Sequence, residues 1–312
     1  MADDIIVPLH SPTAPILGLS ELQSHLEALS NDPALAPDAK LLDQVELQLT
    51  SKSPPPENTN PLVFADPSSL LNALRSPLAS ANLLALAVVG KAASSPAEAD
   101  KLAELPDIVA EIVHRWLESP HVSVGERAAR VLLEVLRTDC GSSVEIVNGT
   151  SNEPRPPGHH RIWPLIFEND TNLTLIRNLC TLDHDPSRST HDITISQGRL
   201  LRLLPPLAAL DIRLLTKPNF LPGTNQCLLQ WAALSMIDKM DMLMHLTLID
   251  FYVSLVTSMA QSPHARDATL KELVQSAARE DSDIKTALGT LGDRVDDDDA
   301  PDLRRYVTYL LS

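Results

Sequence analysis

Residues 105–137 read LPDIVAEIVHRWLESPHVSVGERAARVLLEVLR. Apolar residues recur every three or four positions in both halves, and the polar stretch 118–121 separates the halves. This spacing places apolar side chains along one face of a helix. Proline at position 106 suits the first turn of a helix, and Ser123 with Glu126 has the spacing of a capping box. The stretch therefore predicts two amphipathic helices, over 106–117 and 122–137, joined by a short turn.

The same pattern extends in both directions along the chain. A shorter helix predicted over 96–103 completes a three-helix unit of about 40 residues, the length of an armadillo or HEAT repeat. The other predicted helices lie over 67–74, 80–92, 193–210, 225–237, 240–259, 266–278, 284–291 and 301–311, with two more segments near 20–29 and 37–49. Many short helices and no long ones favour an array over a globular bundle. The predicted fold class is all-α, an armadillo/HEAT-like α-solenoid over residues 19–312, after an N-terminal tail over 1–18.

Three segments interrupt the helical pattern. Residues 51–61 are rich in proline, which fixes φ and removes backbone donors, so we expect a loop there. Residues 140–161 and 183–192 carry glycine, proline and polar residues and are interpreted as loop inserts. A hydrophobic stretch, RIWPLIF over 161–167, follows the first insert.

The composition of the 312 residues excludes several classes of protein. An apolar fraction of 44% is too high for a disordered chain, and only 10 glycines argue against Rossmann and P-loop enzymes. The 41 acidic and 25 basic residues give a net charge of −16, which disfavours direct binding of nucleic acid. The most basic helical stretch, 199–217, spreads its cations thinly and is a weak signal.

No motif for catalysis, cofactor binding or metal binding is present in the sequence. The glycine-rich, serine-hydrolase and metalloprotease signatures are missing, so we expect no enzyme and no cofactor. Cys140, Cys180 and Cys227 are too far apart for a metal or redox motif and are expected to be reduced thiols. His184 stands alone near Cys180, so no metal site is predicted. Met236, Met240 and Met244 have helical spacing and are expected to pack in the core.

The cellular compartment is predicted from the absence of targeting and membrane-spanning segments in the sequence. The N-terminal residues lack a basic and then apolar signal sequence, and the apolar stretch 228–259 contains several charges. We therefore expect a monomeric protein that does not enter a membrane. Its expected location is the cytoplasm, with the nucleus as a second location.

The polar face of the predicted helix over 122–137 carries the candidate binding residues. Arg127, Arg130 and Arg137 lie on it together with Glu134 and Glu126. Their spacings of three and four residues also suit salt bridges within a solvated helix, and that alternative remains open. If this face is the concave side of an array, the arginines and Glu134 are the candidates for partner contact, because arginine is enriched at interfaces.

Four segments carry a resemblance to a known family: LLNALRSPLAS from 70, RIWPLIFEND from 161, ISQGRLLRLLPPLAALD from 195 and LMHLTLIDF from 243. They are similar to the N-terminal region of a fungal helical-repeat family whose members are called DNA mismatch repair proteins. The better-understood relatives are assembly chaperones of the proteasome regulatory-particle base. The likeness spans most of residues 15–312 and rests on segments, without an invariant motif.

The resemblance implies a solenoid that holds the C-terminal domain of an AAA-ATPase subunit before the base is complete, without enzymatic activity or a cofactor. It assigns no single contact residue. The leading hypothesis is therefore a non-enzymatic assembly chaperone. The alternatives are a DNA mismatch repair factor that acts through protein partners and a generic helical-repeat adaptor.

Overall fold

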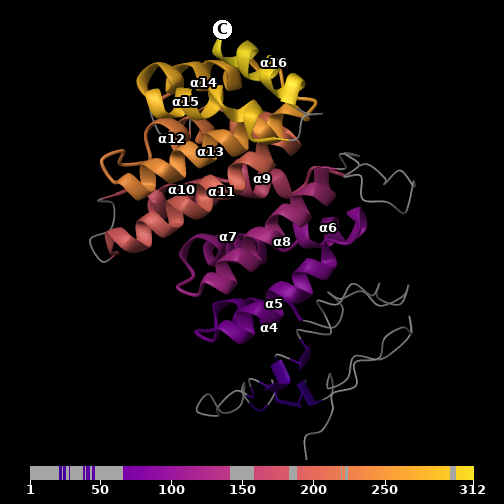
Figure 1. Cartoon of the computed structure of the whole chain (residues 1–312). Helices are drawn as coiled ribbons and strands as arrows, with labels where there is room; N and C mark the ends of the chain where they lie inside the picture. The colour runs from indigo at the N-terminus through magenta and orange to yellow at the C-terminus, as the bar shows by residue number, and fades with distance from the viewer. Residues whose placement is uncertain are drawn as a thin grey trace, which may run out of the picture.

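The computed structural model describes residues 66–140, 158–182, 188–218, 220–221, 224–295 and 300–312, with short stretches between 21 and 45. Across these residues all regular structure is helical and no strand occurs, so the all-α prediction is confirmed (Figure 1). The predicted tail over 1–18 and the proline-rich loop over 51–61 lie outside the described residues.

The helices carry the labels of Figure 1. In chain order they are α4 (Pro67–Arg75), α5 (Ala79–Ala92), α6 (Pro96–Ala103), α7 (Pro106–Glu118), α8 (Val122–Cys140), α9 (Ile162–Phe167), α10 (Asp170–Cys180), α11 (Thr190–Leu215), α12 (Leu228–Leu234), α13 (Met242–Ala260), α14 (Ala268–Glu280), α15 (Ser282–Gly289), the 3-10 helix η1 (Leu291–Asp293) and α16 (Ala300–Leu311).

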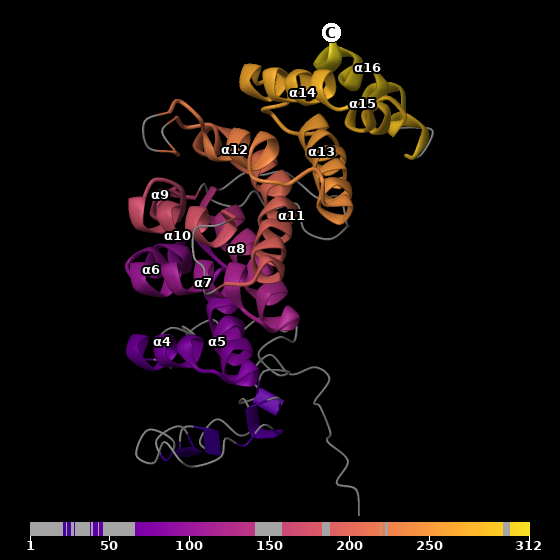
Figure 2. The same cartoon turned by 90° about the vertical axis from the view of Figure 1, so that its left-hand side faces the viewer.

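Helices α5, α8, α11 and α13 lie side by side and form what we call the front row (Figure 1). Helices α4, α7, α10, α12 and α14 lie behind them, as the quarter turn in Figure 2 shows. After each front-row helix the chain returns through rear helices before the next front-row helix begins, so the four front-row helices are parallel. Hydrogen bonds between neighbouring C-terminal ends support this, from Thr138 Oγ1 to Ala93 O at 2.8 Å and from Ser262 Oγ to Ala209 O at 2.8 Å.

Most helices begin at a residue whose side chain accepts a backbone N–H, the usual way to satisfy a free donor. Asp66, Ser95, Asn169, Ser189, Asp241, Asp267 and Asp281 do so at α4, α6, α10, α11, α13, α14 and α15. The capping box predicted at Ser123 is wrong, because α8 begins one residue earlier, at Val122. A capping box is present at α12 instead, where the Cys227 thiol and the Gln230 side chain hydrogen-bond reciprocally to backbone N–H groups.

The central pair α7 and α8 has the predicted bounds to within three residues, and the turn between them is the predicted one. Helix α10 and the helical form of residues 162–167 were not predicted. Helix α11 spans 26 residues, but it consists of two helical segments joined at a bend, the longer of which still exceeds the predicted 18 residues. Its chain bends at Asp211, which has non-helical φ and ψ, so the helix predicted to end at 210 ends close to this bend.

The two loop inserts are shorter than predicted where the structure describes them. Cys140 is the last residue of α8, and residues 190–192 form the first turn of α11. The polar residues 190–192 are interpreted as loop from the sequence. In the structure Asp192 instead supports the helix start by accepting a hydrogen bond from the Ser189 hydroxyl.

One large apolar core runs through the two rows from Leu70 to Leu310. A small second cluster joins Leu22, Leu42 and Val45 to Leu84 of α5, and the described positions of the two N-terminal segments other than Asp38 are helical, as predicted. The methionine stripe is only partly in the core. Met236 and Met244 are buried, but Met240 is 92% exposed because it stands in the turn before α13 and not on a helix.

Candidate protein-binding groove

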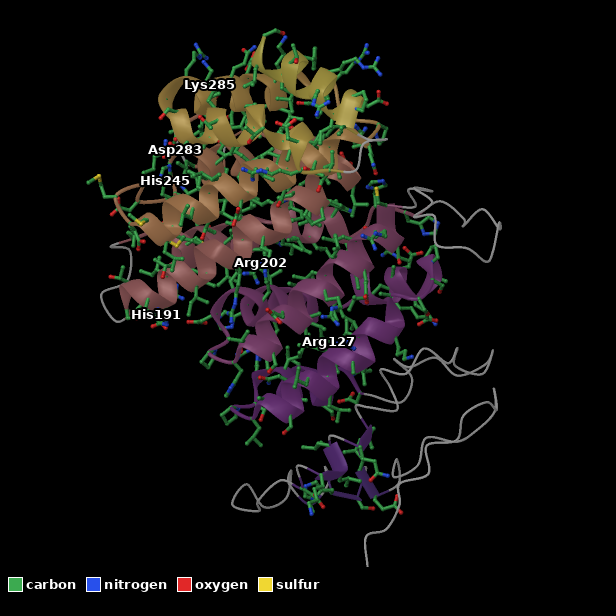
Figure 3. All side chains as sticks on the ribbon, in the orientation of Figure 1. Arg127, His191, Arg202, His245, Asp283 and Lys285 are labelled. Carbon is green, nitrogen blue, oxygen red and sulfur yellow. The ribbon has the colours of Figure 1, made fainter. Side chains whose placement is uncertain are left out.

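Helix α8 packs against α5 on one side and α11 on the other, and this divides its predicted binding face. Arg130 and Glu134 are exposed, whereas Arg127 and Arg137 are half-buried. The four predicted residues therefore do not form one continuous surface. Figure 3 shows the consequence, with Arg127 near α5 and Arg202 of α11 near the opposite side of α8.

Arg127 lies at the seam with α5. Its Nη2 atom is 3.9 Å from the position that a Cβ would take on Gly90, and its Nε atom is buried without a hydrogen-bond partner in the described chain. Burial, and then the positive charge of Arg127, lower the pKa of Lys91 on α5. The seam therefore brings two positive charges close together.

On its other side, α8 forms a groove with α11. It has a volume of about 220 Å³ and is lined by Trp116, Gly125, Glu126, Ala129, Arg130, Leu133, Arg199, Arg202, Leu203 and Pro206. Of the predicted residues, Arg130 alone lines it. Arg199 and Arg202 come from the stretch that the sequence marked as weakly basic; their contribution depends on the pairing of α8 with α11, which the one-dimensional pattern does not contain.

Arg199 is fixed across the groove wall. Its Nη1 atom donates to the carbonyl of Leu117, at the end of α7, at 3.1 Å. Burial lowers the pKa of its guanidinium, Glu126 acts in the opposite direction, and Arg202 adds to the lowering. The guanidinium is thus partly stripped of water, held in place and close to a second cation.

Arg202 and Arg130 are the more exposed charges of the groove rim. Arg202 Nη1 is 3.6 Å from Glu126 Oε1, and the two side chains are 78% and 56% exposed, so this is a weak surface pair. Arg130 forms no ion pair or hydrogen bond with its side chain among the residues that the structure describes. The rim therefore has cationic groups available to a ligand.

The floor of the groove is apolar. Ala129, Leu133, Leu203 and Pro206 line it, and the ring of Trp116 borders it from α7. Trp116 is 1% exposed, and its indole Nε1 atom is buried without a hydrogen-bond partner in the described residues. Buried indole N–H groups usually have a partner.

Large exposed apolar side chains gather at the N-terminal ends of the front-row helices. They are Leu78 before α5, Val122 on α8, Ile195 on α11, and Met240, Met242, Leu243 and Leu246 around the start of α13. Val122 stands one helical turn before Glu126, and Ile195 stands one turn before Arg199. Helical spacing therefore places these two residues one turn before the lining residues Glu126 and Arg199, toward the N-terminal end of the groove.

Histidine and acidic side chains approach one another elsewhere without forming a convincing metal site. His245, Asp281 and Asp283 have ligand atoms within 4.8 Å of one another. However, Asp281 already accepts two backbone N–H bonds as the cap of α15 and pairs with His245 at 2.8 Å. These acids sit at the positive end of a helix, where a cation is disfavoured.

Among the described residues, other histidines and Cys180 do not gather at one place. His159 pairs with Asp100 at 2.6 Å, and His191 is exposed at the start of α11. Cys180 is fully buried, which raises its thiol pKa, and His184 lies outside the described residues. All three cysteines are free of disulfides, and Cys180 and Cys227 are buried.

Helix α13 is long and apolar enough to cross a membrane by length and composition alone. Seven of its residues, Met244, Leu248, Phe251, Tyr252, Leu255, Val256 and Met259, are buried, and the helix packs on α11. Its apolar character thus has an explanation in the core of the fold.

Comparisons with known proteins add no assignment. No protein-family model, no curated protein and no solved structure matches the chain.

Proposed function

We propose that the chain is a non-enzymatic scaffold that binds another protein along its front row, with the α8–α11 groove as the central contact. The observation that carries this proposal is the groove itself, whose exposed lining is almost entirely apolar and includes the side chains of Arg130, Arg199 and Arg202. Interfaces are commonly built this way, with arginine and aromatic residues around a desolvated centre.

The architecture that fits this function is an armadillo/HEAT-like α-solenoid. Helix pairs packed in sequence order, with parallel neighbours in the front row, are the arrangement that such a solenoid requires. A row of this kind presents a long surface on which a partner can make many modest contacts. The proposal is supported by this packing order and by the repeat-length unit around α6, α7 and α8.

The partner that we put forward is the C-terminal domain of an AAA-ATPase subunit of the proteasome regulatory-particle base. The segment resemblance is the support for this choice. The chain would then act as an assembly chaperone in the cytoplasm, masking a surface of the subunit and leaving its ATP chemistry unchanged. The net charge of −16 supports a protein partner over direct contact with nucleic acid.

Native co-purification of the tagged chain from eukaryotic cells, with mass spectrometry of the bound proteins, tests this function. We expect base ATPase subunits to be enriched, and enrichment to fall with Arg130→Glu/Arg202→Glu but not with Arg279→Glu/Lys285→Glu. The latter pair is exposed on α14 and α15 and changes the net charge equally. Enrichment of mismatch repair proteins in place of ATPase subunits, or retardation of duplex DNA at physiological salt, would contradict the proposal.

A further inference from the structure

The groove has the dimensions of a site for one large side chain and its neighbours. A cavity of 150 Å³ is enough to hold benzene, so a groove of about 220 Å³ accommodates an aromatic or leucine side chain. From Val122 to Leu133 the wall of α8 is about 16 Å long at 1.5 Å per residue. About five residues of an extended chain have the same length.

The charges on the rim favour a negatively charged ligand. Arg130, Arg199 and Arg202 face a single acidic rim residue, Glu126. A ligand carboxylate can replace Glu126 at Arg202, because that pair is exposed and 3.6 Å apart. Arg130 needs no rearrangement, since its guanidinium is unpaired in the described structure.

The helices add to this preference. Helix α8 begins at Val122, at the N-terminal end of the groove, so its positive end lies there, while α11 begins five residues before Ile195. The Trp116 indole N–H, on the ring that borders the floor, is buried and has no acceptor in the described residues.

The order of groups along the groove is apolar, cationic and apolar. Val122 and Ile195 are 65% and 37% exposed at one end, the arginines follow, and Leu133 and Pro206, about one turn after Arg130 and Arg202, lie at the other end. Exposed apolar side chains gain from being covered, and guanidinium groups beside an apolar wall pair strongly with carboxylates.

We propose that this groove binds an extended acidic segment of the partner protein, about five residues long, in which carboxylates lie between two apolar side chains. The carboxylates pair with Arg130, Arg199 and Arg202. One apolar side chain covers Val122 and Ile195, and the other enters the space above Leu133 and Leu203. This inference rests on the proposed function in that it names the partner chemistry of the same groove.

A synthetic probe tests the inference on the full chain. The probe is the acetylated and amidated peptide Leu-Glu-Asp-Glu-Phe, titrated by calorimetry and by the indole ¹H–¹⁵N signal of Trp116, which Trp116→Phe assigns. We expect saturable binding that shifts this signal, and binding roughly ten-fold weaker for Leu-Gln-Asn-Gln-Phe and for Gly-Glu-Asp-Glu-Gly. Affinity should fall between 50 and 200 mM salt, because the rim charges are exposed to solvent.

Variants of the chain locate the probe. Arg130→Glu/Arg202→Glu should weaken it roughly ten-fold, while Arg279→Glu/Lys285→Glu leaves it unchanged. Glu126→Gln removes the internal competitor and should tighten binding by about three-fold, an effect that misfolding does not produce. Equal affinity for the acidic and amide probes, or no response to the groove variants, would overturn the inference. So would a dimer in sedimentation that Arg130→Glu/Arg202→Glu dissolves, because a second copy would then occupy the groove.

The two proposals fail in different ways. If the probe binds as expected but no base ATPase subunit is captured, the groove inference stands and the identity of the partner is wrong. If the ATPase subunit is captured equally by the wild type and by Arg130→Glu/Arg202→Glu, and the probe does not bind, the choice of an ATPase partner stands, but the groove inference and the groove as the central contact are both wrong.

Discussion

Gly125 of α8 lies directly against the guanidinium of Arg199 on α11, so closely that a Cβ at position 125 would stand 2.5 Å from Arg199 Cζ. The missing side chain allows Arg199 to lie flat across α8 and reach the Leu117 carbonyl at 3.1 Å. One glycine thus sets how α7, α8 and α11 meet and where the groove cations stand. The sequence pattern around Ser123 and Glu126 does not contain this contact.

Substitution of this glycine tests the contact. Gly125→Ala gains about 0.5–1 kcal/mol of helix preference but displaces a charged hydrogen bond that contributes about 1.5–3 kcal/mol, so we expect a net loss near 1 kcal/mol. Urea unfolding followed by circular dichroism measures it. Gly198→Ala is the control, because nothing lies within 4 Å of its Cβ position, and it should gain about 0.5–1 kcal/mol. Equal gains in the two variants would show that Arg199 moves without cost.

Asp139 joins the end of α8 to the start of α9. Its buried carboxylate accepts backbone N–H bonds from Arg161 at 2.9 Å, Ile162 at 2.8 Å and Trp163 at 3.3 Å. Asp139→Ala leaves these donors without an acceptor and should lower the free energy of unfolding by about 3 kcal/mol. Asp107→Ala, an exposed acid in the first turn of α7, is the control and should change it by less than about 1 kcal/mol. A similar loss in both variants in urea titrations would contradict this role.

Gln197 connects three helices through one side chain. It is 1% exposed, and its Nε2 atom donates to Cys180 O at 2.8 Å, at the end of α10, and to Met236 O at 2.9 Å, after α12. Gln197→Leu keeps the size but leaves both buried carbonyls unpaired, so we expect a loss of about 2–3 kcal/mol. Hydrogen exchange should rise first at the ends of α10 and α12. Gln275→Leu on α14 is the matched control, and exchange that rises evenly over the chain would argue against the local role.

The central helices could be predicted from sequence because their signals are local. Residues 106–137 combine helical spacing, a tolerated proline and a short polar turn, and all of these act within one or two turns. Helix α9 has only six residues and contains Pro164, and its start depends on Asp139, which is 23 residues from Ile162. No window of sequence contains that contact. Helix α10 did have a local signal, since Asn169 accepts N–H bonds from Thr171 and Asn172 as its cap.

The candidate site shows the same limit. The sequence identified the face of α8 that carries Arg130, but it also placed Arg127 and Arg137 on one surface with it. Packing of α5 against Arg127 divides that surface. Arg202 is a candidate because α11 packs beside α8, a contact that the sequence pattern does not contain. Which helices are neighbours depends on the whole array, so periodicity alone does not determine it.

The bend in α11 is stabilised by a carboxylate, and its protonation should lower the free energy of unfolding at acidic pH. Asp211 Oδ1 accepts from the backbone N–H of Arg213 at 3.1 Å and from its Nε at 2.9 Å, and Oδ2 accepts from Nη2 at 2.9 Å. Burial by itself raises the pKa of this carboxyl, but these hydrogen bonds and the charges of Arg213 and His264 outweigh it, so the pKa lies below its ordinary value of 3.8.

The sign of the pH effect follows from that direction. A carboxyl whose pKa is lower in the folded state stabilises the fold above the pKa of the unfolded chain, and this contribution is lost as pH falls below about 3.8 toward the folded value. Asp211→Asn lacks the titrating group, so its free energy of unfolding should be lower than wild type at pH 7, and the difference should shrink between pH 4 and pH 2.5. Urea midpoints across this range measure it, with the exposed Asp250→Asn as control. A difference between Asp211→Asn and wild type that stays constant down to pH 2.5 would mean that the Arg213 pair does not stabilise the bend.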